Sequence, residues 1–178
     1  MFFHDLGKPR CYTETDGKGH FHGHSKVSFE ITKEIMRRLK YDNATREAVS
    51  DLVLYHDADI RPNAKSVKKW LNKLGEVRLR QLIEVKKADN TAKPVEFVHD
   101  RLNAFDEIVT VIDEVIEQEQ CFSLKDLAVN GRDLIDIGIT AGAKIGAVLD
   151  SLMDLVIDEK IENDKAKLLK YVLENYEI

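Results

Sequence analysis

The chain has 178 residues, 43% of them hydrophobic and 33% charged, and a formal net charge of −5, which is typical of one soluble, cytoplasmic domain with room for a helical extension. The acidic balance argues against a free-standing nucleic-acid binder, because affinity for nucleic acid depends largely on cations that neutralise phosphates. Two cysteines outside any CxxC spacing indicate neither a disulfide framework nor a zinc site, and no apolar run approaches the roughly 20 residues that span a membrane.

The first part of the chain predicts a loop or small hairpin followed by helices. Residues 9–24 are rich in Gly, Thr and His, and Asp16-Gly17 is a strong turn signal within them. From Ser25, apolar residues recur at four-residue spacing with charged residues between them, which predicts an amphipathic helix. Asn43 is the expected N-cap of a second helix.

Helices are also expected in the rest of the chain. Two follow Pro62, separated at Gly75, and Pro94 suits the first turn of a long amphipathic helix. After a short segment at 123–138, which glycines interrupt, periodic apolar residues predict two last helices, the second from Asn163. No segment favours a buried sheet, so the predicted fold class is all-α.

A basic segment lies in the middle of this acidic chain. It runs from residue 65 to residue 87 and holds eight basic side chains against two acidic ones, Glu76 and Glu84. The basic residues are Lys65, Lys68, Lys69, Lys73, Arg78, Arg80, Lys86 and Lys87. Such a segment is either the solvated surface of a helix or a face that attracts phosphate, and composition alone favours the first interpretation.

Histidines and aspartates at or near the ends of the predicted helices carry the candidate chemistry. They are His4, Asp5, His24, His56 and Asp89. Imidazole and carboxylate together bind divalent metals, and an all-helical fold builds such a site from side chains on separate helices. A metal held in this way polarises a phosphoryl oxygen and lowers the pKa of its water from about 15.7 to about 7. Convergence of the five side chains would therefore indicate phosphoester hydrolysis.

A His-Asp dipeptide is weak evidence alone, because the chain contains three, which begin at His4, His56 and His99. The first is followed by Leu-Gly-Lys-Pro, which would end a helix beside a glycine-rich loop. The third lies in mid-helix and is interpreted as solvated surface. His56 taken alone is equally well a helix-terminal histidine favoured by the macrodipole, and Asp57 and Asp59 are interpreted as turn residues.

Four stretches of sequence together make a more specific pattern: FFHDLGKP, GHFHGHS, YHDADIRP and KKADNTA. They resemble the HD superfamily of metal-dependent phosphohydrolases, in the branch found within tRNA nucleotidyltransferases and bacterial poly(A) polymerases. The resemblance implies a helical HD-domain bundle in which His4, Asp5 and Asp89 bind a divalent metal (Mg, Mn, Ni, Co, Fe or Zn). It also implies that His24 and His56 are catalytic histidines, which contact phosphate or a second metal.

The stretches KSVKKWLNKLG and LAVNGRDLIDIGITAGAKIGAVLDSLMDLVIDEKIEN resemble the C-terminal helical parts of the same nucleotidyltransferases. The resemblance thus divides the chain into an HD domain at 1–120 and a C-terminal helical extension at 121–178. In the family this C-terminal part helps to hold tRNA. The residues that the resemblance assigns to RNA or phosphate binding are Lys65, Lys68, Lys69 and Arg132.

The chain departs from the family pattern at its start. The family has a further histidine ligand and a nucleotidyltransferase head upstream of the HD pair, whereas this chain starts three residues before His4. We therefore expect a fragment of a longer protein with a weak or incomplete metal site. The resemblance implies a metal-dependent phosphohydrolase acting on phosphomonoesters or 2′,3′-cyclic phosphates of nucleotides or tRNA. The alternative is a non-catalytic tRNA-binding module that serves a CCA-adding nucleotidyltransferase head.

Overall fold

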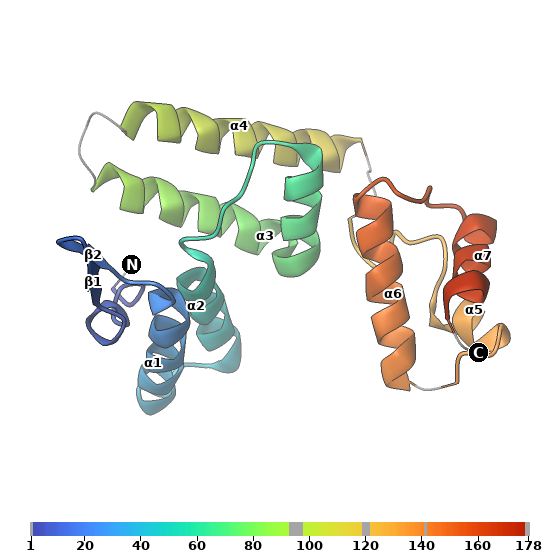
Figure 1. The fold of residues 1–178 in the computed structure, drawn as a ribbon, viewed down its shortest axis with the longest axis horizontal. Helices are drawn as coiled ribbons and strands as arrows, with labels where there is room; N and C mark the ends of the chain where they lie inside the picture. Colours follow the sequence, from blue (N-terminus) through green and yellow to red (C-terminus); the bar gives the residue numbers. More distant parts are fainter. Residues whose placement is uncertain (1, 93–97, 119–121, 141, 177–178) are drawn as a thin grey trace. The chain divides into compact units, whose positions relative to one another are not determined.

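The computed structural model describes residues 2–92, 98–118, 122–140 and 142–176. Within these ranges the chain forms seven α-helices and one antiparallel pair of short strands, which confirms the predicted all-α fold class (Figure 1). The elements are a 3₁₀ helix η1 (Lys8–Arg10), β1 (Thr13–Thr15), β2 (Lys18–His20), α1 (His24–Arg38), α2 (Asn43–Tyr55), α3 (Ala64–Thr91), α4 (Val98–Glu117), α5 (Gly131–Asp136), α6 (Gly142–Ile157) and α7 (Lys165–Asn175). None of the described helices is long and apolar enough to cross a membrane.

The chain divides into two compact units. Unit 1 comprises Met1–Asp59 and Val77–Asp106, and unit 2 comprises Ile60–Glu76 and Glu107–Ile178. Helix α3 contributes to both units and is interrupted at Gly75, whose φ of +72° lies in the left-handed region that favours glycine. The helix boundary predicted at Gly75 is therefore confirmed.

Helices α1 and α2 pack side by side in unit 1 (Figure 1). α1 begins at His24, directly after Gly23, which has a φ of +79°. Its buried face then continues through Ser28, Thr32 and Met36, at the four-residue spacing of one helix face. This face is largely polar, which is unusual for a helix that packs against a neighbour.

Helix α2 has its N-cap at Asp42 rather than at the predicted Asn43. The carboxylate of Asp42 accepts a hydrogen bond from the backbone N–H of Thr45 at 2.9 Å, so the capping interaction starts one residue earlier. The helix ends at Tyr55, and His56 is its C-cap. The last turn of α2 therefore carries His56 to the end of the helix, beside the start of α1.

Unit 2 contains a continuous apolar core built largely from α5, α6 and α7. Its fully buried members include Leu134, Ile139, Leu152, Met153, Ile157 and Leu168. Helix α4 also buries apolar side chains at helical spacing, at Ile108, Ile112 and Val115. The predicted first turn at Pro94 lies outside the described residues. Burial of such side chains contributes roughly 1.5–3 kcal/mol each, so unit 2 is held together mainly by the hydrophobic effect.

Candidate metal centre

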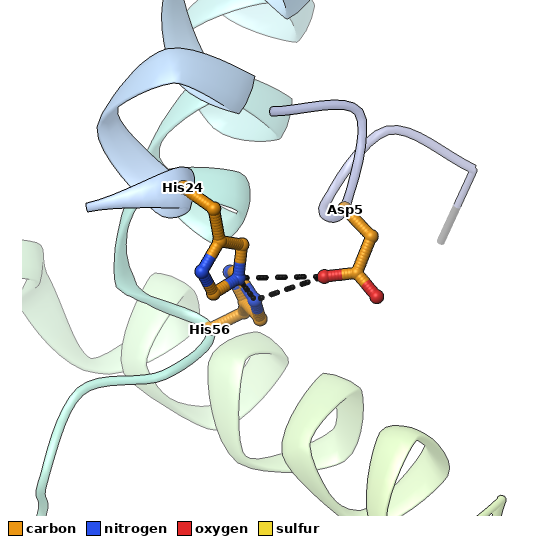
Figure 2. A group of neighbouring side chains, drawn as sticks. All are labelled: Asp5, His24 and His56. Carbon is orange, nitrogen blue, oxygen red and sulfur yellow. Dashed lines mark hydrogen bonds and ion pairs between the residues drawn. The ribbon is translucent and has the colours of Figure 1, made fainter. Parts of the chain in front are cut away.

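Three side chains from separate parts of unit 1 meet in space. Asp5 comes from the N-terminal turn, His24 from the first residue of α1 and His56 from the C-cap of α2. Each offers one ligand atom, and the three atoms all lie within 4.8 Å of one another. Figure 2 shows the carboxylate of Asp5 directed at the two imidazole rings. Residues 19 and 32 positions apart along the chain thus form one cluster with the donor types of a metal site.

The N-terminal turn is held against α1 at Gly7. The backbone N–H of Gly7 donates to Ser28 Oγ at 2.8 Å, within the buried face of α1. A Cβ atom at position 7 would lie only 2.4 Å from the carbonyl oxygen of His24, so only glycine permits this approach. The close packing at Gly7 fixes the position of Asp5, two residues earlier, relative to the first turn of α1.

Both cluster histidines are oriented by backbone carbonyl groups. His24 Nδ1 lies 2.9 Å from the carbonyl oxygen of Phe21, and His56 Nδ1 lies 2.7 Å from that of Val53. A carbonyl oxygen only accepts, so each Nδ1 carries the proton and, in a neutral ring, each Nε2 carries a lone pair. Burial lowers the pKa of His56, which keeps its ring neutral at physiological pH. A proton on Nδ1 bound to a carbonyl is the arrangement that metal-binding histidines usually have.

Two of the three distances within the cluster lie in the range found between ligands of one ion, and the third is somewhat longer. The two Nε2 atoms lie 3.2 Å apart, and Asp5 Oδ1 lies 3.4 Å from that of His24 and 3.8 Å from that of His56. Ligands about 2.1 Å from a common ion are about 3.0–3.4 Å apart in octahedral or tetrahedral geometry. Two lone pairs that face each other repel unless a cation lies between them.

Asp5 adds a second indication that the cluster fits a cation. Its Oδ1 atom is shielded from solvent, and no described residue donates a hydrogen bond to it. A shielded carboxylate oxygen without a donor is unfavourable, because that oxygen has lost its water and gained no hydrogen bond, although Lys8 pairs with the other oxygen of the same carboxylate. A divalent ion between Asp5, His24 and His56 would satisfy this oxygen and both nitrogen lone pairs at once. The residues present therefore fit a metal.

Of the other two predicted ligands, His4 lies beside the second oxygen of Asp5, and Asp89 lies beside His4. His4 Nε2 is 3.3 Å from Asp5 Oδ2 and 3.3 Å from Asp89 Oδ1. The ring of His4 also packs edge-on against that of His56, with centroids 5.0 Å apart. All five predicted site residues are thus neighbours in unit 1. The tightest group of ligand atoms, however, joins Asp5 to His24 and His56, the two residues expected to contact phosphate.

Asp57 also lies at the cluster, although the sequence interpretation made it a turn residue. Its Oδ2 is 3.2 Å from His24 Nε2, and its Oδ1 is 3.6 Å from His56 Nε2. The carboxylate therefore stands opposite the same two nitrogen atoms as Asp5 does, and it remains about half exposed. The sequence signal was its position directly after His56, but nothing local distinguishes this pair from the exposed one at His99.

Two lysines support the centre without forming part of the predicted site. Lys86 Nζ, from α3, donates to the carbonyl oxygens of His56 and Ala58, at 2.7 Å each. It thereby fixes the backbone on both sides of Asp57. Lys8 Nζ lies 2.6 Å from Asp5 Oδ2. The sequence left Lys86 either on a solvated helix surface or on a face that attracts phosphate, whereas the structure directs its ammonium group at backbone carbonyls.

The predicted RNA-binding residues lie in unit 2. Lys65 Nζ and Lys69 Nζ lie 3.1 Å and 2.8 Å from Asp158 Oδ1, and Lys160 also pairs with this carboxylate. One carboxylate therefore gathers three ammonium groups. The other two predicted RNA-binding residues are Lys68, half-buried in α3, and Arg132, exposed in α5.

Comparison with known proteins gives the relationships of the chain. Its sequence matches the family model of tRNA nucleotidyltransferase domain 2 over residues 24–172. It is also similar to an A-adding tRNA nucleotidyltransferase of Deinococcus radiodurans, with 25% identity over 154 residues. That similarity covers 85% of this chain and 35% of the relative, so the chain spans about a third of the relative's length. No solved structure matches the chain significantly. Because the family model covers most of the sequence, the chain belongs to the tRNA nucleotidyltransferase domain 2 family.

Proposed function

We propose that unit 1 is an HD-type, metal-dependent phosphohydrolase that acts on phosphomonoesters or 2′,3′-cyclic phosphates. The observation that carries the proposal is the cluster of Asp5, His24 and His56, with two imidazole lone pairs and a shielded carboxylate oxygen directed at one point. A cation between these ligand atoms would satisfy the shielded carboxylate oxygen, which has no hydrogen-bond donor among the described residues, together with both nitrogen lone pairs.

The ligand set has two halves that share Asp5. Oδ1 of Asp5 would hold a metal together with His24 and His56, while Oδ2 faces His4 and, beyond it, Asp89. A bound divalent ion would supply Lewis acidity, which polarises a phosphoryl oxygen and makes water more acidic. Imidazole and carboxylate ligands suit Mn, Fe, Co, Ni, Zn or Mg, and the donor types do not select among them.

The chain's own residues would perform the remaining tasks. Lys8 is partly exposed beside Asp5 and would attract the phosphate by its charge. Asp57, opposite the two cluster nitrogens and half exposed, is accessible to a water molecule or a substrate hydroxyl and could accept a proton there. Lys86 would keep Asp57 in place through the two flanking carbonyls.

The experiment is a hydrolysis assay paired with a binding measurement on the full chain. Mn²⁺, Co²⁺, Ni²⁺, Zn²⁺ and Mg²⁺ are each tested with p-nitrophenyl phosphate and 2′,3′-cyclic AMP, and metal affinity is measured by calorimetry. We expect Asp5→Ala, His24→Ala and Asp89→Ala to reduce metal-dependent turnover roughly a hundredfold or more. His99→Ala is the matched control, because His99 begins the exposed His-Asp pair in α4. Turnover that survives in Asp5→Ala and His24→Ala would contradict the proposal.

A second candidate function, tRNA binding, is favoured by the lysine cluster in unit 2. Lys65, Lys69 and Lys160 all pair with the carboxylate of Asp158, so three partly exposed ammonium groups gather on one surface of an acidic chain. The family description refers to a tRNA nucleotidyltransferase domain. We therefore propose that this surface contacts RNA phosphates, with or without turnover in unit 1.

The test of the second candidate is the salt dependence of tRNA binding. A protein that neutralises phosphates loses affinity as salt rises, and each lost contact reduces the slope by about one. We expect Lys65→Ala with Lys69→Ala to weaken binding and to reduce this slope. Lys170→Ala is the control, because Lys170 is an exposed lysine of α7 that pairs with Glu174. An unchanged slope in the double variant would exclude this surface.

A further inference from the structure

The hairpin between Asp5 and His24 has one aromatic face. Strands β1 and β2 pair with Thr13 opposite His20 and Glu14 opposite Gly19. The same register places Tyr12 opposite Phe21, and cross-strand partners share a face. Their rings lie 5.6 Å apart at a tilt of 51°.

Contacts with Gly19 and Glu14 fix the position of the Tyr12 ring. A Cβ atom at position 19 would lie 2.8 Å from the Tyr12 ring, so the ring covers the bare backbone of Gly19. The Tyr12 hydroxyl donates to Glu14 at 2.9 Å. The absence of a side chain at Gly19 therefore permits the ring to lie flat over the strand pair rather than stand away from it.

Two contacts join this aromatic face to the candidate metal centre. The ammonium group of Lys8 lies 2.6 Å from Asp5 Oδ2 and 5.7 Å from the centroid of the Phe21 ring. The carbonyl oxygen of Phe21 is the group that orients His24 through Nδ1, at 2.9 Å. Lys8 therefore links the carboxylate of Asp5 to the aromatic pair, because its ammonium group contacts both.

The two rings are not part of a core. Tyr12 is 54% exposed and Phe21 is 37% exposed, although each packs against the other. Proteins that bind unpaired nucleic-acid bases often use solvent-exposed aromatic rings, which stack on the bases, and nearby cations, which hold the phosphate. The aromatic pair next to Lys8 resembles such a binding surface. In unit 1 the cation and the candidate phosphate site are adjacent to the rings.

We propose that Tyr12 and Phe21 form a stacking platform for the nucleobase of the substrate, whose phosphate lies at Asp5, His24 and Lys8. This inference rests on the proposed function for the location of the phosphate, and it narrows the substrate class to phosphoesters that carry a base. Stacking uses the π face that every base has, so the platform selects nucleotides over sugar phosphates without selecting one base. Lys8, held between the carboxylate and Phe21, adds attraction for the phosphate that joins the two subsites.

Binding is tested with a matched pair of phosphonates in which carbon replaces the ester oxygen, so that neither is hydrolysed. One probe is the 5′-methylenephosphonate of adenosine, and the other is the same phosphonate of ribose without a base. Calorimetry on the Mn²⁺-loaded chain should give a tighter dissociation constant for the adenosine probe by about 5- to 150-fold, the range of one base stacked on aromatic rings. Nuclear magnetic resonance of the Mg²⁺-loaded chain should show upfield shifts of the adenine protons.

Four variants separate the platform from general effects. Phe21→Leu and Tyr12→Leu keep apolar bulk and should remove most of the preference for adenosine. Gly19→Ala should reduce it too, because the new methyl group displaces the Tyr12 ring. Tyr41→Leu is the control: Tyr41 is 51% exposed and follows the other end of α1. Circular dichroism confirms that the helices persist in each variant.

The outcomes distinguish this inference from the proposed function. If the wild-type chain binds both phosphonates equally, or binds neither, the platform is refuted, whatever the hydrolysis assays show. A preference for adenosine that survives in both Phe21→Leu and Tyr12→Leu also refutes it. If the preference is present and is lost in these variants while no metal gives turnover, the platform stands and the hydrolytic function fails.

Discussion

The two compact units differ in whether they bury polar side chains. Every buried residue that the structure describes in unit 2 is apolar, and the core of this unit extends through α5, α6 and α7. Among the described residues, all the buried polar side chains belong to unit 1: His24, Ser28, Thr32, Ser50, His56 and Asn90. Unit 1 has buried apolar side chains as well, among them Leu79, Leu82 and Ile83. A buried polar group lowers stability unless a partner satisfies it, so unit 1 depends on specific polar contacts in addition to packing.

The buried polar residues of unit 1 include some that have a ligand or hydrogen-bonding role and two whose hydroxyl groups have no hydrogen-bond partner among the described residues. His24 and His56 are the candidate ligands, and Ser28 accepts a hydrogen bond from the N-terminal turn. Thr32 Oγ1 and Ser50 Oγ are shielded from solvent, and no hydrogen-bond partner for either lies among the described residues. Both units bury apolar side chains, and the contrast between them is that the buried polar groups, with the candidate chemistry, are concentrated in unit 1.

The largest effect is expected from a cavity in unit 2. Leu152 is fully buried in α6, so Leu152→Ala should lower the free energy of unfolding by about 2–5 kcal/mol, measured with urea. Metal affinity should not change at temperatures where the variant is folded, because every candidate ligand lies in unit 1. A large loss of metal affinity in folded Leu152→Ala would show that the metal centre in unit 1 depends on the core of unit 2, which would contradict this expectation.

Lys86→Met should affect both stability and the metal centre. The variant removes two hydrogen bonds from an ammonium group to the carbonyls of His56 and Ala58, which should cost about 1–3 kcal/mol. Loss of this support should also weaken metal affinity about tenfold, as measured by calorimetry. Lys87→Met is the matched control, since the adjacent Lys87 pairs with exposed carboxylates and should change stability by less than about 1 kcal/mol. Equal effects of the two variants would show that Lys86 does not position the site.

Thr32→Val should stabilise the protein slightly or leave its stability unchanged. Valine has the shape of threonine and lacks the hydroxyl group, which has no hydrogen-bond partner among the described residues, so we expect a gain of about 0–1 kcal/mol. Ser28→Ala is the contrasting variant, because it removes the acceptor for Gly7 N and should cost about 1–3 kcal/mol. Chemical denaturation of both variants measures the difference. A marked loss of stability in Thr32→Val would show that its hydroxyl has a partner.

Local patterns in the sequence predicted many of the secondary-structure elements. Apolar spacing located the helices, the Asp16-Gly17 signal located the hairpin turn, and Gly75 marked the break in α3. The order of elements follows from such signals because each one acts over a few residues. The two units could not be found in this way, since unit 2 combines Ile60–Glu76 with a segment that starts more than thirty residues later. The family-based boundary at residue 120 stays a prediction.

Only some features of the candidate site could be predicted from the sequence. His-Asp spacing and family resemblance named His4, Asp5 and Asp89, but they could not say which oxygen of Asp5 faces which histidine. Asp57 was missed because its relation to His24 depends on how α1 and α2 pack. The aromatic pair beside the site depends likewise on strand register and on a contact through Lys8.

An effect that depends on pH is expected from the lysine cluster of unit 2. Lys69 and Lys65 lower the pKa of Asp158 well below its ordinary value. Because the folded-state pKa is depressed, the stabilisation is complete above the unfolded-state value of about 3.9 and declines progressively as the pH falls from there through the folded-state pKa. Asp158→Asn should therefore be less stable than the wild type at pH 7, and the difference should become smaller as the pH falls toward 2.

Comparing the wild type with Asp158→Asn across pH distinguishes the contribution of this ion pair to stability from that of the apolar core. The lysines are about half exposed, so water and salt screen the pairs and the difference at pH 7 should be smaller than that from Leu152→Ala. Melting temperatures of both proteins between pH 7 and pH 2, at low and at high salt, measure it. A difference as large at pH 2 as at pH 7 would mean that Asp158 stabilises unit 2 through hydrogen bonds or packing rather than through charge, and unit 2 would then resemble unit 1 in depending on a specific polar group.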